Sequence, residues 1–245
     1  MLVRLKQVFP SLTDIVVAGH SAGGQTTVRY ALSSKVKASD AGVASIKYIV
    51  GNPSSYPYLG PQRPTNFPGC TPFLVPNSTV IASCTYYDNW RYGVKKVSGY
   101  IANVTAAVAI AQFENRDVVY LLGQNDTCNE LLDPTCNSHG LAKTCSNMLQ
   151  GRWRLERGLC YCAFLDFFYG SSSSGCGPHY YKIIPGVAHS SYGLFSSVIG
   201  RNEIFHARRT NSKSSGDDFS DDLSVASLGS VSIIPFIITL IALNL

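Results

Sequence analysis

The feature that most constrains the fold of this chain is a short apolar run that leads directly into a glycine-rich turn. Residues 15–18 (IVVA) are rich in β-branched side chains, which is typical of a strand buried in a parallel sheet. Residues 19–24 (GHSAGG) form a sharp turn, and residues 22–33 then read as a helix. A strand, a tight turn and a helix in this order indicate an α/β fold with a parallel sheet.

More strands and helices follow from the same kinds of pattern. Short apolar runs of strand length occur at residues 46–50, 118–122 and 181–184. Apolar residues recur at helical spacing in residues 2–9, 100–113 and 140–169. Because these helices alternate with the strands, the prediction of a parallel sheet covered by helices extends over most of the chain.

Composition and charge argue against two broad classes of protein. Hydrophobic residues make up 45% of the 245 residues and charged residues 14%, so the chain can bury a core and is not disordered overall. The net charge is +5, but the basic residues are scattered rather than gathered in a stripe, so we expect no nucleic-acid binding. The densest basic group is Arg152, Arg154 and Arg157, which we interpret as a solvated helix face.

The turn after the first strand carries a candidate nucleophile. Its residues Gly19, His20, Ser21, Ala22 and Gly23 match the pattern G-x-S-x-G, placed between a buried strand and a helix as a nucleophile elbow requires. Such a turn strains the serine backbone and lifts the hydroxyl clear of the sheet, while the glycines let helix and strand approach closely. The N–H of Ala22 would lie at the helix N-terminus, where it can stabilise an oxyanion.

A serine hydroxyl is a weak nucleophile unless a base removes its proton, and the base needs an acid to orient it. In folds with this elbow the chain order is serine, acid, histidine. Asp126 is the first acidic residue after the predicted strand 118–122, and Asp133 is the reserve candidate. Asp166 fits less well, because it falls inside a predicted helix.

The candidate base is His189, which lies in the loop that follows the predicted strand 181–184. The ring of His20 is expected to point elsewhere, because His20 adjoins the nucleophile. The remaining histidines either precede the last strand or lie near the end of the domain, and they are His139, His179 and His206. We therefore expect Ser21, Asp126 and His189 to form the catalytic group, with Asp126 orienting His189 rather than carrying a proton itself.

These residues resemble the α/β-hydrolase superfamily, and more narrowly the chain resembles secreted α/β-hydrolases of fungal type. The resemblance spans about residues 12–200 and is carried by residues 19–24, 52–56, 89–93, 121–126, 150–152 with 157–158, and 184–189. It implies an α/β-hydrolase fold and a serine hydrolase of the esterase or lipase kind. In such an enzyme the serine forms an acyl-enzyme with an ester substrate, and water then hydrolyses it.

The chain departs from the superfamily before the elbow. In these folds several strands precede the nucleophile, and an early loop supplies the second N–H of the oxyanion hole. Here Ser21 has only twenty residues before it, and the strand at residues 15–18 would keep an open edge. We therefore expect that sequence upstream of Met1 is missing.

Eight cysteines in loop-rich sequence indicate disulfides and an oxidising compartment. The spacing leaves the pairing open, although Cys70 and Cys84 lie in one proline-rich loop and are the pair we expect to be local. The competing hypothesis is a zinc site, which lacks the usual paired C-x-x-C spacing and would use Cys128, Cys136, His139 and Cys145. Because nucleotide, flavin and metal motifs are absent from the sequence, we expect no metal and no cofactor.

The composition divides the chain into a hydrolase domain, a linker and a tail. Residues 1–208 form the domain, within which the irregular residues 53–98 are expected to act as a lid. Residues 209–224 are a polar linker, and residues 225–245 carry no charge. This tail is either a signal for a GPI anchor or one membrane-spanning helix, and either would place the protein in the secretory pathway and at a membrane or cell surface.

The sequence is consistent with two functions of different class. The first is hydrolysis of a small-molecule or lipid-like ester by the three candidate residues. The second is binding by a hydrolase fold that has no catalytic activity, or by an inactive fragment. Turnover of an ester that depends on Ser21 separates the two, whereas the sequence leaves the oligomeric state open.

Three N-x-S/T sequons give a prediction about glycosylation: Asn77, Asn103 and Asn125. The last sequon contains Asp126, so a glycan on Asn125 would crowd the candidate acid. Glycopeptide mapping should find sugar on Asn77 or Asn103 and a bare Asn125. A sugar on Asn125 would argue against Asp126 as the acid.

Overall fold

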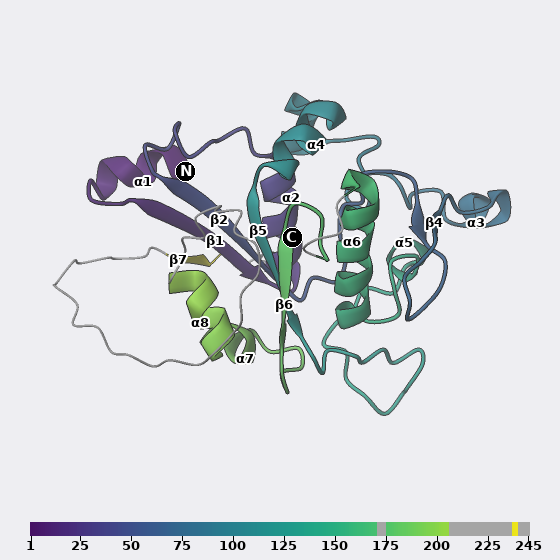
Figure 1. Cartoon of the computed structure of the whole chain (residues 1–245). Coiled ribbons are helices and arrows are strands. Elements are labelled where there is room, and N and C mark those ends of the chain that lie inside the picture. Colours follow the sequence, from purple (N-terminus) through teal and green to yellow (C-terminus); the bar gives the residue numbers. More distant parts are fainter. Residues whose placement is uncertain (171–174, 206–236, 240–245) are drawn as a thin grey trace.

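The computed structural model describes residues 1–170, 175–205 and 237–239, which form a parallel β-sheet flanked by helices (Figure 1). Within these residues the main sheet has five strands in the order β6-β5-β2-β1-β7, and all neighbours are parallel. The strands are β1 (Asp14–His20), β2 (Ser45–Gly51), β5 (Asp117–Gly123), β6 (Tyr180–Ile184) and β7 (Ile237–Thr239). The four strands predicted from apolar runs are confirmed as β1, β2, β5 and β6.

The register of the sheet brings the carboxyl ends of its strands to one edge. His20 at the end of β1 pairs with Gly51 at the end of β2, and Gly51 pairs with Leu121 near the end of β5. Gly123 at the end of β5 pairs in turn with Ile184 at the end of β6. Because parallel strands share a direction, the loops that follow them all leave from this edge.

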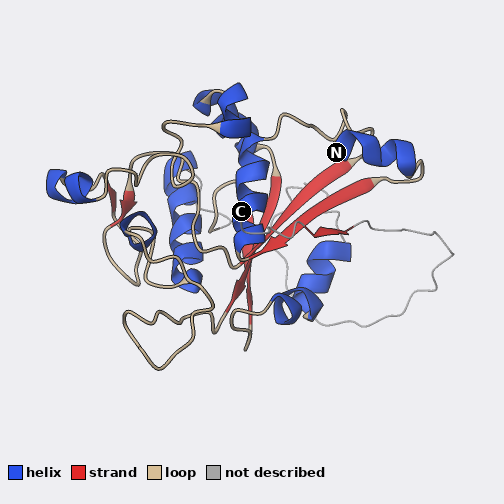
Figure 2. Ribbon diagram, turned by 180° about the vertical axis from the view of Figure 1, so that it is seen from behind, coloured by secondary structure: helices blue, strands red, loops and turns tan. Residues whose placement is uncertain are grey.

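Helices cover both faces of the sheet, as Figures 1 and 2 show. Alternate strand residues face opposite layers, so Tyr48 and Tyr120 pack in a core with α2, α4 and α6, whereas Ile49 and Val119 pack with α7 and α8. The helices are α1 (Leu2–Val8), α2 (Ala22–Ser33), α3 (Ser78–Ser83), α4 (Ala106–Glu114), α5 (Cys145–Met148), α6 (Arg154–Tyr169), α7 (Ser191–Ser196) and α8 (Val198–Phe205).

Two of the predicted helices are interrupted. The stretch 100–113 begins as a 3₁₀ helix (Gly99–Asn103), and α4 starts afresh after Thr105, whose hydroxyl accepts a hydrogen bond from the Val108 N–H. The stretch 140–169 contains α5 and α6, separated by a turn in which Gly151 has a φ of +143°. Such a φ is readily adopted only by glycine, so the chain leaves the helix there.

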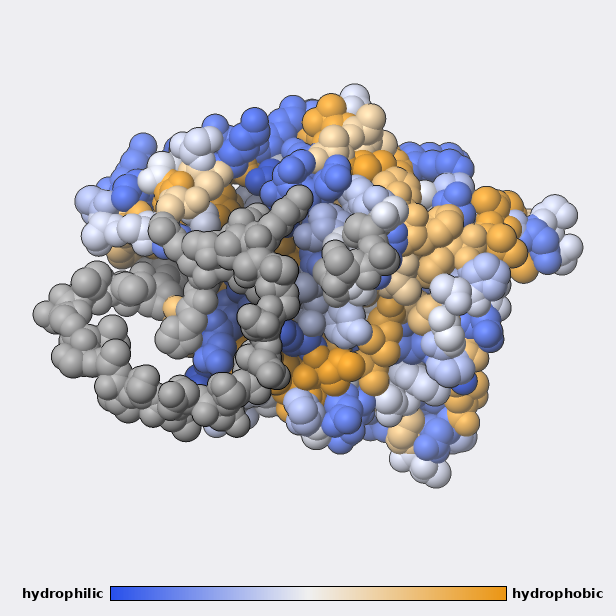
Figure 3. All heavy atoms as spheres, in the orientation of Figure 1, coloured by the Kyte–Doolittle hydropathy of each residue, from blue (hydrophilic) through white to orange (hydrophobic). Residues whose placement is uncertain are grey.

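The excursion at residues 53–98 contains the short antiparallel strands β3 (Arg63–Pro64) and β4 (Phe73–Leu74), followed by α3. Its first part is anchored in the core, where the ring of Tyr56 stacks on that of Tyr161 in α6 with 4.6 Å between centroids. Apolar side chains gather on the surface over α4 and the outer part of the excursion (Figure 3), where Leu74 and Val108 are exposed. The role of this segment as a lid stays a prediction.

The interpretation of Arg152, Arg154 and Arg157 as a solvated helix face was wrong. Arg154 and Arg157 are fully buried, and their guanidinium groups donate to carbonyl oxygens of neighbouring loops. Only Arg152 is partly exposed, and it pairs with Glu156. The spacing of charges along a sequence does not show that irregular loops will cover both sides of a helix.

All eight cysteines form disulfides, which is typical of proteins from an oxidising compartment. The bonds are Cys70–Cys160, Cys84–Cys145, Cys128–Cys136 and Cys162–Cys176. The expected local bond between Cys70 and Cys84 was wrong, because the excursion lies across α5 and α6 and each of its cysteines meets one from those helices. The cysteines considered as zinc ligands are all bonded in pairs.

The polar linker 209–224 lies outside the described residues, and so does most of the apolar segment 225–245. Of that segment, the three residues of β7 pair with Val16, Val17 and Ala18 of β1. Among the residues that are described, no helix has both the length and the apolar character needed to cross a bilayer. Asn77 and Asn103, the candidate glycosylation sites, are both exposed.

The disulfides should differ in their contribution to stability. In the unfolded chain Cys70–Cys160 closes a loop with a sequence separation of 90, whereas Cys128–Cys136 has a separation of 8. The loop-entropy relation then gives losses of about 4.6 kcal/mol for Cys70→Ser with Cys160→Ser and about 2.6 kcal/mol for Cys128→Ser with Cys136→Ser. Denaturant unfolding of both double variants measures the difference. A larger loss for the short loop would contradict this ranking.

Candidate active site

Ser21 lies at the sharp turn between β1 and α2, with φ 56° and ψ −118°. Its N–H donates to the Gly51 carbonyl over 2.8 Å, which fixes the turn against the end of β2. Gly19 allows the turn to be tight, because a Cβ there would lie 2.3 Å from the Gly23 carbonyl oxygen. Gly24, which is outside the five-residue pattern, is equally restricted, since its Cβ would lie 2.5 Å from the Gly51 oxygen. A non-glycine residue with this φ is strained, and packing of the helix on two strands maintains it.

The residues after Ser21 begin α2 and leave backbone donors beside the hydroxyl. Because Ala22 is the first residue of the helix, its N–H has no carbonyl partner within the helix. Ala22 is also exposed. Gly23 is buried, and its carbonyl accepts from the Thr27 hydroxyl over 2.9 Å. The N-terminus of α2 is therefore placed to favour negative charge next to Ser21.

The loops after β5 and β6 are held together at the same edge of the sheet. The Gln124 N–H donates to the Ile184 carbonyl, and the Asn125 N–H donates to the Val187 carbonyl over 2.8 Å. Gly123 permits this contact, because a Cβ there would lie 2.7 Å from the carbonyl oxygens of both Val187 and Ala188. These bonds join the segment that carries Asp126 to the one that carries His189.

Asn52 is a site residue that the sequence analysis did not identify. It follows β2, is fully buried and has a φ of 41°. Its side-chain oxygen accepts from the Gly123 N–H over 2.8 Å, and its amide nitrogen donates to the Ala188 carbonyl over 3.4 Å. Asn52 thus links β2 to both loops. The sequence signal that could have identified it is an asparagine directly after the predicted strand 46–50, at the same edge of the sheet as the elbow.

The three candidate residues come together in the expected order. His189 Nε2 lies 3.0 Å from Ser21 Oγ, and His189 Nδ1 lies 2.7 Å from Asp126 Oδ2. The side chain of His189 is 7% exposed and that of Asp126 is 2% exposed, so water has little access to the bond between them. A neutral imidazole with its proton on Nδ1 donates to the carboxylate and leaves Nε2 free to accept the serine proton.

The alternative acids do not contact His189. Asp133 lies on an exposed turn, where the hydroxyl and the N–H of Thr135 donate to its carboxylate and hold its pKa below the ordinary value. Asp166 lies on α6, where its carboxylate accepts a hydrogen bond from the Gly177 N–H over 2.6 Å. Among the described residues, Asp126 is the carboxylate paired with His189.

The other histidines are placed less simply than the sequence suggested. The expectation that the ring of His20 points elsewhere was wrong: it packs against the ring of His189, with 4.4 Å between centroids. The ring of His139 lies 5.9 Å from that of His189 and nearly parallel to it. His179 is buried directly before β6, where its ring nitrogens contact the Phe113 carbonyl and the Tyr120 hydroxyl. His206 lies outside the described residues.

The described residues contain no group of three or more histidine, cysteine, aspartate or glutamate side chains arranged to hold a metal ion. The geometry instead provides a hydroxyl, an imidazole and a carboxylate in line, beside a helix N-terminus. Such an arrangement can deprotonate the hydroxyl and stabilise negative charge on a nearby oxygen.

Comparison with known proteins reveals similarity of fold. The structure is similar to poly(aspartic acid) hydrolase-1 from Sphingomonas sp. KT-1, with a TM-score of 0.51 and 21% identity, over 79% of this chain and 56% of that one. It also matches LpqC, a poly(3-hydroxybutyrate) depolymerase from Bordetella parapertussis, with a TM-score of 0.49 and 18% identity, over 81% of this chain and 51% of that one. No protein-family model and no curated protein sequence matches the chain.

The similarity to poly(aspartic acid) hydrolase-1 bears out the expected fold, and the chain has the α/β-hydrolase fold. The chain spans about half the length of the solved structures it matches.

Two histidines with a lowered pKa, the partly buried His20 and the buried His179, make stability depend on pH. Burial, together with the neighbouring His189, lowers the pKa of His20 to about 4, and burial lowers that of His179 to about 4. The ordinary value in an unfolded chain is about 6.5, so between these values the unfolded state binds more protons. The contribution of these histidines to stability should therefore be complete above about pH 6.5, fall as the pH is lowered from 6.5 to 4, and change little below about 4.

Urea unfolding at several pH values between 4 and 7 measures this dependence. Both His20→Gln and His179→Gln should reduce the proton uptake on unfolding by about one proton near pH 5. An unchanged slope in His179→Gln would show that His179 is not buried in its neutral form.

Proposed function

We propose that this protein is a serine hydrolase that cleaves ester bonds through Ser21, His189 and Asp126. The observation that carries the proposal is the continuous relay from Ser21 Oγ through the His189 ring to Asp126 Oδ2, with distances of 3.0 and 2.7 Å. The strained backbone of Ser21 at the start of α2 supports the same assignment.

The proposed reaction has two halves. Ser21 Oγ attacks the ester carbonyl carbon while His189 Nε2 takes the hydroxyl proton, and the carbonyl oxygen becomes an oxyanion next to the Ala22 N–H. Collapse of this intermediate breaks the bond to the alcohol, which leaves with the proton from His189. Water then attacks the acyl-enzyme, His189 takes the proton of that water, and the acid product leaves as Ser21 regains its hydrogen.

Asp126 would hold the tautomer of His189 that has its proton on Nδ1. When His189 becomes an imidazolium, the carboxylate 2.7 Å away stabilises its charge. The pairing is favoured by burial, because a charge interaction is stronger where water is excluded.

We further propose that the enzyme acts outside the cell, where its four disulfides persist. The two solved structures are named for hydrolysis of poly(aspartic acid) and poly(3-hydroxybutyrate), so polymeric substrates belong in the assay beside small esters. The excursion at residues 53–98 is the proposed wall of the substrate site.

The test is ester hydrolysis and fluorophosphonate labelling of folded, oxidised protein. Ser21→Ala should lose the label and lower kcat/KM for a p-nitrophenyl ester by about 10⁴-fold or more, because it removes the hydroxyl that His189 Nε2 contacts. Ser33→Ala is the matched control, since Ser33 lies at the other end of α2 and should leave the rate within about 2-fold.

Peptide mapping identifies the labelled residue. Label on Ser21 together with turnover supports a hydrolase. A folded wild type that takes no label and hydrolyses no ester, small or polymeric, would rule out this proposal and support a binding function for the fold.

A further inference from the structure

Two fully buried arginines one turn apart on α6 differ in what they contact. Arg157 donates to the carbonyl oxygens of Gly151, Ser54 and Ala142 over 2.9, 2.6 and 2.9 Å. Among the described residues it has no carboxylate within 4.0 Å, so its role is to hold loops together. Arg154 makes bonds of the same kind but also faces a carboxylate.

The carboxylate that Arg154 faces is that of Asp126. Arg154 Nη1 lies 3.6 Å from Asp126 Oδ1, and the two side chains are 0% and 2% exposed. The other oxygen of the carboxylate, Oδ2, is the one that bonds His189. The carboxylate therefore lies between a guanidinium on one side and an imidazole on the other.

Arg154 is itself held rigidly. Its Nε donates to the Ser54 hydroxyl over 3.1 Å, its Nη2 donates to the His139 carbonyl over 3.0 Å, and its Nη1 donates to the Ser138 carbonyl. The backbone of the same helix adds a further bond, because the Leu155 N–H donates to the Asp126 carbonyl over 3.1 Å. Both the main chain and the side chain of Asp126 are thus positioned by the first turn of α6.

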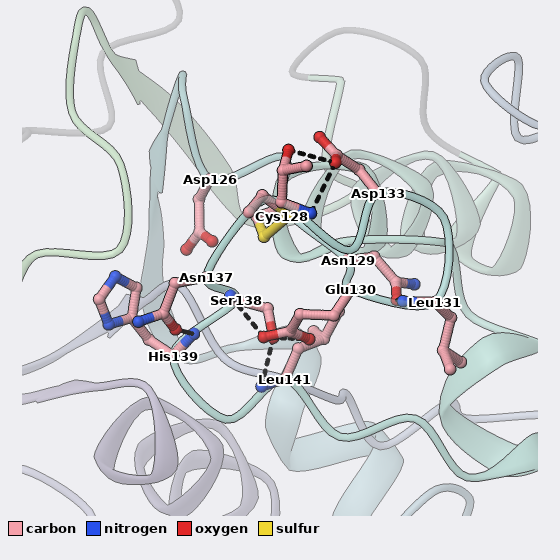
Figure 4. The surroundings of a disulfide bond; sticks show 12 residues. Asp126, Cys128, Asn129, Glu130, Leu131, Asp133, Asn137, Ser138, His139 and Leu141 are labelled. Carbon is pink, nitrogen blue, oxygen red and sulfur yellow. Dashed lines mark hydrogen bonds between the residues drawn. A yellow bond between two sulfur atoms is a disulfide. The ribbon is translucent and has the colours of Figure 1, made fainter.

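The bonds from Arg154 also reach the loop between Asp126 and His139, which Figure 4 shows around the disulfide Cys128–Cys136. Glu130 closes this loop from inside by accepting from the Ser138 N–H over 2.7 Å. Arg154 donates to the carbonyl oxygens of Ser138 and His139 at the end of this loop. These bonds hold the backbone of His139, whose ring lies beside that of His189.

We propose that Arg154 is a positioning residue for the relay, which holds the Asp126 carboxylate with Oδ2 toward His189 and fixes the loop that carries His139. This inference rests on the proposed function for its effect on catalysis. A buried carboxylate without a counter-charge is costly and tends to reorient or take up a proton. Arg154 supplies the counter-charge from the side that His189 does not use.

The experiment compares Arg154→Met with Arg157→Met in the full oxidised chain. Both changes remove a buried guanidinium from the same helix, so both should lower the Tm. Below the Tm, Arg154→Met should lower kcat for a p-nitrophenyl ester by about 100-fold with little change in KM, because a displaced relay costs about that much. Arg157→Met should retain the wild-type kcat.

A second readout does not depend on turnover. A proton on His189 Nδ1, hydrogen-bonded to Asp126 over 2.7 Å, should give a downfield resonance in the proton NMR spectrum of the wild type. This resonance should be lost or shifted in Arg154→Met and retained in Arg157→Met. If Arg154→Met does not fold, Arg154→Lys replaces it. This variant keeps the positive charge beside Asp126 but not the fork of donors. Measured below its Tm, its kcat should fall by less than the 100-fold expected for Arg154→Met.

Equal kcat and an equal resonance in the two methionine variants would overturn the role of Arg154. A wild type with the resonance but without ester turnover would instead overturn the proposed function and leave the positioning role standing.

Discussion

Parallel strands end at a common edge, and the meeting of the carboxyl ends of β1, β2, β5 and β6 at that edge is the constraint on which the rest of this molecule depends. Each strand sends a loop from that edge, and the loops carry Ser21, Asn52, Asp126 and His189. Glycine at the ends of the strands lets the loops touch: a side chain at Gly123 would collide with the segment that precedes His189. The relay is therefore a product of sheet register and of close backbone contact.

Buried polar groups then hold the edge in a single arrangement. Asn52 joins the ends of β2 and β5 to the His189 loop through its side-chain amide. On the other side of the Asp126 carboxylate lie the buried Arg154 and Arg157 of α6. Their guanidinium groups donate to carbonyl oxygens of the neighbouring loops. Such buried groups are costly if left unpaired, so each of them favours the one arrangement of loops that satisfies it.

The irregular parts of the chain are fixed by covalent bonds and by aromatic packing. Cys70–Cys160 and Cys84–Cys145 tie the excursion to α6 and α5, while Cys128–Cys136 closes the loop after Asp126. Stacking of Tyr56 on Tyr161 places the start of the excursion in the core. Long loops with little regular structure are ordered here because these links limit the conformations open to them.

The sequence by itself determined the strands, the elbow and the order of the candidate residues, because hydrophobic runs, glycines and chain order are local features. It could not determine which cysteines meet, that Arg154 and Arg157 are buried, or that the ring of His20 lies against His189. Those facts depend on how loops far apart in the chain cross one another. Only the tertiary structure decides such contacts, since a side chain is buried or paired by what packs over it and not by its neighbours in sequence.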